Sequence, residues 1–203
     1  MSGRRSGQRF DAEYGVTTEA LVFLGELDPD AIGPSLRYAT HYEPTPVAQA
    51  VGLLDASPLA PKDATFVDLG AGMGRIVLLA ARRPFRAVIG VEISPALVEI
   101  GRENLARAND PARVTRDVRI VRGDAGTYRF PPGHLVVYLY NPFQAPVLQA
   151  VLANLTRPLK KRREVVLLYH TPVERDTIDA CEEFELVRDL GFGLVYRLRG
   201  ASG

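Results

Sequence analysis

The sequence FVDLGAGMG, which runs from Phe66 to Gly74, joins a short apolar run to three glycines at alternate positions. Residues 75–83 continue with helical spacing up to Pro84, and the apolar residues 87–91 lead directly to Glu92. A strand, a glycine turn, a helix and a second strand that ends on a carboxylate predict the nucleotide-binding half of a doubly wound α/β sheet. Glycines suit such a turn because a bound ligand can approach the backbone closely where no Cβ intervenes.

The spacing of the glycines indicates which kind of nucleotide is bound. The pattern here is G-x-G-x-G, through Gly70, Gly72 and Gly74, whereas dinucleotide folds usually show G-x-G-x-x-G. Asp68 precedes it, and a carboxylate there suits a ligand with an ammonium or sulfonium group and would repel a pyrophosphate. Glu92, at the end of its strand, can accept hydrogen bonds from ribose hydroxyls. The whole pattern resembles motif I of the class I (seven-strand, Rossmann-like) S-adenosylmethionine-dependent methyltransferases; the alternative is a glycine-rich turn in another α/β protein.

Length and composition favour one domain. The chain has 203 residues, 46% of them apolar, and a net charge of +1 that offers no general attraction for nucleic acid or an anionic membrane. No apolar run approaches a membrane span, and a single cysteine, Cys181, fits a reducing cytoplasm. Three dispersed histidines and one cysteine have no metal-ligand spacing, so we expect no metal. We expect a disordered basic tail over residues 1–9, an N-terminal helical cap over 10–63 and the Rossmann-like core over 64–203.

The spacing of apolar residues and the positions of Pro and Gly predict the remaining elements. We expect helices at about 19–27, 46–55, 94–108, 144–155 and 173–180, and strands at 117–121, 135–140, 164–169, 184–190 and 194–198. The predicted fold is a doubly wound, mostly parallel seven-stranded sheet with a C-terminal antiparallel hairpin and an N-terminal helical segment. The strand count matches that of class I methyltransferases, and the resemblance covers about Tyr42 to Leu198. Residues 10–11 and 14–16 also resemble the opening of a group of small bacterial members.

The resemblance implies S-adenosylmethionine as cofactor and S-adenosylhomocysteine as product. It places Asp68 near the methionine ammonium, Glu92 at the ribose and Ile93 against adenine. The Asp124 carboxylate would accept from the adenine amino group, and the Ala125 amide would donate to a ring nitrogen. The residues expected to pass under the methionine and ribose are Gly70, Ala71, Gly72 and Gly74. For Asp124 the alternative is a cap of a helix or turn.

The segment Asn141–Pro142–Phe143 follows a predicted strand and resembles the [N/D]-P-P-[Y/F] motif of methyltransferases that act on planar nitrogens. In that motif the Asn oxygen accepts from the target nitrogen and the aromatic ring stacks on the target. The present segment is one proline short, which puts adenine-type recognition in doubt. Asn141 is therefore expected to orient the nucleophile beside the cofactor, and Phe143 or Tyr140 to form a wall. The alternative is an Asx turn before Pro142.

Two further places have ambiguous signals. In Tyr42–Glu43–Pro44–Thr45–Pro46, Tyr42 and Thr45 are expected over the methionine end of the cofactor, and the alternative is only a capped helix with Thr45 as N-cap. His170 ends the fifth strand and could act as a base, although a lone histidine is more often structural.

The expected activity is transfer of a methyl group to a nitrogen of a protein side chain. Few residues separate the fifth strand from the hairpin, which predicts an open site suited to a side chain. The alternatives are a small-molecule N- or O-methyltransferase, an RNA methyltransferase and a non-catalytic cofactor-binding module. A monomer and a homodimer are both compatible with the sequence.

Overall fold

The computed structural model describes residues 2–19, 43–157 and 163–200, with side chains from residue 7 onward. The strands are β1 (Ala64–Leu69), β2 (Ala87–Glu92), β3 (Val118–Arg122), β4 (His134–Tyr140), β5 (Val165–His170), β6 (Phe184–Asp189) and β7 (Gly193–Leu198). The helices are α1 (Ser2–Tyr14), α3 (Val47–Asp55), α4 (Arg75–Ala80), α5 (Pro95–Arg107), α6 (Ala145–Thr156) and α7 (Arg175–Asp179), with a 3₁₀ turn η3 (Pro61–Asp63). The strands and the helices from α3 onward lie within a few residues of their predicted positions.

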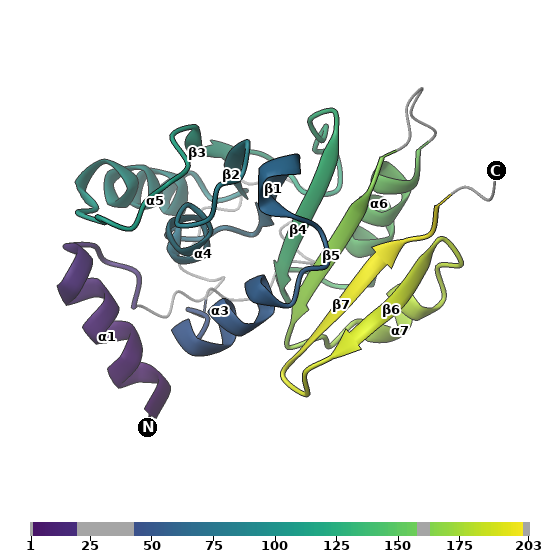
Figure 1. Cartoon of the computed structure of the whole chain (residues 1–203), viewed down its shortest axis with the longest axis horizontal. Coiled ribbons are helices and arrows are strands. Elements are labelled where there is room, and N and C mark those ends of the chain that lie inside the picture. The colour runs from purple at the N-terminus through teal and green to yellow at the C-terminus, as the bar shows by residue number, and fades with distance from the viewer. Residues whose placement is uncertain (1, 20–42, 158–162, 201–203) are drawn as a thin grey trace.

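The seven strands form one sheet in the order β3-β2-β1-β4-β5-β7-β6 (Figure 1). The first five pair in parallel, whereas β7 runs antiparallel to both β5 and β6. This arrangement confirms the doubly wound, mostly parallel sheet with a terminal hairpin. Because the order reverses between β1 and β4, their carboxyl ends border a crevice, which is where open α/β sheets bind ligands.

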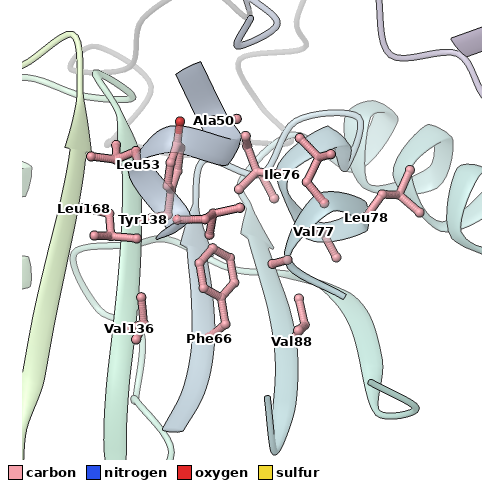
Figure 2. Packing of buried hydrophobic residues seen from close by; sticks show 14 of the residues in the cluster. Ala50, Leu53, Phe66, Ile76, Val77, Leu78, Val88, Val136, Tyr138 and Leu168 are labelled. Carbon is pink, nitrogen blue, oxygen red and sulfur yellow. The ribbon is translucent and has the colours of Figure 1, made fainter. Parts of the chain in front are cut away.

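Helices cover both faces of the sheet. One face packs against α3, α4 and α5 through a cluster that includes Phe66, Val136 and Tyr138 (Figure 2). The opposite face packs against α6 and α7 through a second cluster that includes Leu69, Leu139 and Leu167. Side chains of alternate strand residues therefore enter different cores, and the central strands are apolar almost throughout because both of their faces are covered.

The N-terminus differs from its prediction. Residues 2–9, predicted to be disordered, belong to helix α1. The first residues of this helix are polar and do not predict it; the residues that pack against the core lie in its C-terminal half. There, Phe10 is 5% exposed in the cluster of α3, α4 and α5, and the Arg82 guanidinium lies 4.4 Å from the Tyr14 ring centroid. Tertiary contacts thus stabilise a helix that its own composition does not predict.

Two further N-terminal predictions concern residues 19–27 and the start of α3. The helix predicted at 19–27 lies outside the described residues except for Glu19, as does Tyr42. Thr45 was expected to cap α3, but the N-cap is Pro46, whose carbonyl accepts from the Ala50 amide at 3.0 Å. Thr45 stands one residue further back, so its carbonyl is free to accept from Arg75 instead.

Candidate cofactor site

The glycine loop is a sharp turn at the carboxyl end of β1. Gly70, Gly72 and Gly74 have φ angles of 78°, 52° and 89°, in the left-handed region that glycine adopts at least cost. The amides of Gly70 and Ala71 donate to the Val91 carbonyl at 2.9 and 3.1 Å, so the loop folds across the end of β2. This places the glycines of motif I at the switch point of the sheet, as predicted.

Glu92 holds this loop in place. Its carboxylate accepts from the amides of Gly72 at 2.9 Å and Ser94 at 2.8 Å, and the side chain is buried. Burial raises the pKa of Glu92, and the backbone hydrogen bonds partly oppose that rise. A carboxylate has about four acceptor positions, so Glu92 can hold the loop and still accept from a ribose hydroxyl.

Asp68 lies in a small cavity beside the loop. The cavity has a volume of about 50 Å³ and is lined by Glu43, Pro44, Thr45, Asp68, Gly70, Ala71, Arg75, Ile76, Tyr138 and Tyr140. Burial raises the pKa of Asp68 well above its usual range, and the Glu92 charge adds to the effect. Because a buried carboxylate gains most from a nearby cation, this environment suits the ammonium group of an amino acid.

The cavity also holds an unsatisfied polar atom. The Tyr138 hydroxyl is fully buried, and no described group is placed to form a well-aligned hydrogen bond with it. The Thr45 side chain comes near enough to act on the pKa of Tyr138 as a hydrogen-bond partner would, and the Asp68 charge acts on it as well. Buried hydroxyls normally have partners, so an orphan facing a cavity points to a polar ligand. The volume admits only a few non-hydrogen atoms, as the amino-acid end of S-adenosylmethionine would supply. The residues present therefore fit that group.

A polar cluster, which the sequence reading missed, ties the N-terminal segment to this site. Arg75, the first residue of α4, is 3% exposed and donates through Nε to Thr18 Oγ1 at 2.8 Å. Its terminal nitrogens donate to Glu19 Oε2 at 2.7 Å and to the Thr45 carbonyl at 3.2 Å. Gly7 of α1 packs directly on the cluster, since a Cβ there would lie 1.7 Å from Glu19 Oε2.

Asn104 of α5 extends this connection. Its amide nitrogen donates to the carbonyls of Thr17 at 2.8 Å and Met73 at 2.9 Å, and its oxygen accepts from the Thr17 amide at 2.9 Å. Asn104 is fully buried, so these bonds are protected from water. Asn104 lies at helical spacing from Leu97 and Gly101, on the buried face of α5, and a polar residue at such an inward position is the sequence signal that could have found it.

The residues assigned to adenine lie at the ends of β2 and β3. Ile93, Asp124 and Ala125 are half-buried, and the Gly123 amide donates to the Glu92 carbonyl at 2.9 Å, which brings the two strand ends together. Asp124 Oδ1 also accepts from the Gly126 amide at 2.9 Å. The turn cap is therefore present, and one carboxylate can cap the turn and also accept from a ligand.

Asn141 and Phe143 diverge at the end of β4. Asn141 has a φ of 38°, and Pro142 rests on the glycine loop, since a Cβ on Gly70 would lie 2.6 Å from Pro142 Cβ. Asn141 is thereby placed beside the loop. Phe143, in contrast, is 7% exposed in the cluster under α6, on the other face of the sheet. The expectation that Phe143 forms a wall of the site is wrong for this structure, because the shortened turn directs its ring into the core.

The surroundings of His170 are those of a buried structural histidine. Its Nε2 pairs with Gln49 Oε1 at 2.9 Å and its Nδ1 with Thr171 Oγ1 at 3.1 Å, and burial lowers its pKa from 6.5 to about 4. Both ring nitrogens are engaged, so the geometry gives no support to a role as base. Tyr140, which lines the cavity and packs edge-on against the His170 ring, has its pKa raised to about 12 by burial and by the Glu43 carboxylate.

Within the described ranges, no group of three His, Cys, Asp or Glu side chains could hold a metal ion. None of the helices in those ranges is long and apolar enough to cross a membrane.

Part of the chain is similar to known methyltransferases. Residues 66–162 match the family described as methyltransferase domain. A segment of 84 residues is 36% identical to ribosomal protein L11 methyltransferase from Alteromonas mediterranea, covering 39% of the present chain and 28% of that enzyme. A segment of 61 residues is 46% identical to a 23S rRNA (uracil-C5)-methyltransferase from Alcanivorax borkumensis, covering 30% and 13%. The chain thus aligns with less than a third of the length of either curated relative.

Among solved structures, an RNA methyltransferase from Salinibacter ruber in complex with S-adenosyl-L-homocysteine superimposes with a TM-score of 0.54 at 26% identity. The alignment covers 76% of the present chain and 92% of that one. The family match spans the glycine loop, Glu92, Asp124 and the end of β4. The match shows residues 66–162 to be a methyltransferase domain, and the sheet order gives it the Rossmann-like fold of the class I S-adenosylmethionine-dependent enzymes, whose cofactor the cavity fits.

Proposed function

We propose that the protein transfers a methyl group from S-adenosylmethionine to a nitrogen of a protein side chain. The observation that carries the proposal is the position of Asn141, whose left-handed turn at the end of β4 rests against the glycine loop through Pro142. An amide oxygen there can accept a hydrogen bond from a target nitrogen and orient it. Non-glycine residues rarely adopt this backbone conformation, and they cluster at functional sites.

The bound cofactor supplies an activated methyl group, so the protein's task is mainly to bind and orient. The glycine loop and Glu92 would hold the ribose side, Asp68 the amino-acid end, and Asp124 with Ala125 the base. His170 and Tyr140 are poorly suited to remove a proton near neutral pH, because the first has a pKa of about 4 with both nitrogens engaged and the second a pKa of about 12. The acceptor nitrogen would therefore release its proton to water.

Access to the site favours a macromolecular acceptor. The segment between β5 and β6 forms the short helix α7, which packs on the face of α6 and leaves the carboxyl ends of β1 and β4 uncovered by that segment. A partial match to a ribosomal protein methyltransferase favours a protein acceptor. A second candidate is RNA, which is favoured by the longer structural match to an RNA methyltransferase.

Labelled S-adenosylmethionine, offered in parallel with bacterial ribosomal proteins and with ribosomal RNA, tests the acceptor. We expect label in the protein fraction, recovered as an N-methyl amino acid after hydrolysis. Label confined to RNA would replace the first candidate by the second, and no transfer to any acceptor by a protein that binds the cofactor would support a non-catalytic binding module.

Variants at Asn141 test its role in that reaction. Asn141→Gly keeps the left-handed backbone at no steric cost and removes only the amide, so we expect turnover to fall by roughly 100-fold with cofactor affinity unchanged. Asn141→Ala adds backbone strain and serves as a comparison. Full turnover by the glycine variant would contradict the proposed role.

A further inference from the structure

Among the described residues, three tyrosines are fully buried, and their hydroxyls differ in one respect. Tyr138, Tyr169 and Tyr196 are 0%, 1% and 1% exposed. Tyr169 accepts from the Glu174 amide at 3.1 Å, and Tyr196 donates to Asp179 at 2.7 Å. Among the described residues, the Tyr138 hydroxyl has no hydrogen-bond partner.

Strand register explains where the Tyr138 hydroxyl points. Tyr138 of β4 stands opposite Asp68 of β1 in the parallel pair, so the two side chains leave the same face of the sheet. Figure 2 shows the Tyr138 ring between Leu53 and Ile76, with its oxygen directed away from Phe66. Both Tyr138 and Asp68 line the cavity beside the glycine loop.

The Tyr138 oxygen does not stabilise the folded protein when no ligand is bound. A buried hydroxyl without a partner has lost its hydrogen bonds to water and destabilises the folded state, whereas phenylalanine would fill the same space without that cost. The ring itself packs in the cluster of α3, α4 and α5 as phenylalanine would. A polar atom that the fold does not need, at the wall of a cavity, indicates a contact made to a ligand.

The chemistry of the cavity narrows the ligand group. Asp68 offers an acceptor, and burial raises the pKa of Tyr138, so that its hydroxyl stays protonated and offers a donor. An acceptor and a donor side by side complement the ammonium and carboxylate of one α-amino acid. Arg75 lines the same cavity, but its three nitrogens already donate to Thr18, Thr45 and Glu19.

We propose that the Tyr138 hydroxyl is a cofactor-binding group that donates to the carboxylate at the amino-acid end of S-adenosylmethionine, beside Asp68. This assignment rests on the proposed cofactor. It gives Tyr138 a role in affinity alone, since the carboxylate is remote from the methyl group that is transferred.

Tyr138→Phe tests the proposal because the hydroxyl is the only group removed. Calorimetric titration should show S-adenosylhomocysteine binding about 10-fold more weakly than to the wild type. Binding of 5′-methylthioadenosine, which lacks the amino-acid end, should be unchanged. The melting temperature of the ligand-free variant should equal or exceed that of the wild type, because an unsatisfied buried group is gone.

Tyr196→Phe is the matched control. It removes a buried hydroxyl that donates to Asp179, so its melting temperature should fall while both affinities stay at the wild-type values. Unchanged S-adenosylhomocysteine affinity in Tyr138→Phe, equal weakening of both ligands, or a loss of thermal stability like that of the control would each overturn the inference alone. A folded wild type that binds neither ligand would overturn the proposed function and the inference together.

Discussion

The carboxyl ends of the central strands and the terminal hairpin use charged side chains in opposite ways. At the carboxyl ends of β1 and β2, Asp68, Glu92 and Arg75 are at most 6% exposed, and they hold backbone or line the cavity. On the hairpin of β6 and β7, Glu185 pairs with Arg197 at 2.6 Å with both side chains in water. The same residue types therefore organise a binding site where they are buried and mainly cover a surface where they are exposed.

Loss of the Glu92 carboxylate should have the largest effect. Glu92→Ala removes the acceptor for the Gly72 and Ser94 amides and for a ribose hydroxyl. Each charge-assisted hydrogen bond lost contributes about 1.5–3 kcal/mol, so we expect S-adenosylhomocysteine affinity to fall by about 1,000-fold in calorimetric titration. Glu185→Ala, on the terminal hairpin, is the control and should bind like the wild type.

Arg75 and Arg82 both contact α1, but only Arg75 is fully buried at the site. Replacing each in turn separates the effect of the buried charge from the effect of α1 docking. Arg75→Met leaves Glu19 and Asp11 without their cation and should lower the free energy of unfolding by about 3–5 kcal/mol, measured in urea. It should also weaken cofactor binding, since Thr45 loses its donor. Arg82→Met breaks the ion pair with Asp110 and should destabilise the fold while leaving affinity unchanged. Equal losses of affinity in both variants would show that α1 docking, and not Arg75 itself, organises the cavity.

His170 is a buried group whose effect depends on pH. Its pKa is about 4 in the fold against 6.5 for an exposed histidine, so the unfolded state takes up a proton first as the pH falls. Stability should therefore be complete above pH 6.5 and be lost between pH 6.5 and 4, by up to about 3 kcal/mol. Urea unfolding at several pH values measures this, with His170→Asn as the reference without titration; parallel curves for the two proteins would contradict it. Gln49, Thr171, Tyr140 and Phe192 surround the ring and carry no charge in this range.

The smallest effect is expected on the hairpin. Glu185→Gln removes the charge that pairs with Arg197 and Arg199, all of them in contact with water. Water and salt screen such pairs, so the urea midpoint should not change measurably. A clear loss of stability there would contradict the contrast between the buried charges beside β1 and β2 and the exposed charges of the hairpin.

Much of the site could be predicted because short-range spacing dictates it. The glycine pattern, Asp68 before it and Glu92 at the next strand end lie within one β-α-β unit, whose geometry depends on local turns and on the right-handed crossover. The strands from β1 to β7 could be placed for the same reason, since apolar periodicity and Pro or Gly breaks are local signals. Phe143 could not be placed, because the direction of its ring depends on how Pro142 packs against Gly70.

Sequence alone therefore determined the doubly wound fold, the cofactor class and the positions of Asp68 and Glu92 at the carboxyl ends of neighbouring strands. Tertiary structure decided which polar groups share the cavity. Tyr138 meets Asp68 through strand register, and Arg75 meets Thr18, Glu19 and Thr45 across more than 25 residues of chain. Such contacts have no local sequence pattern, because their partners come together only when distant elements pack. Burial then makes an unpaired polar atom destabilising, so that its position in the folded structure draws attention to a ligand.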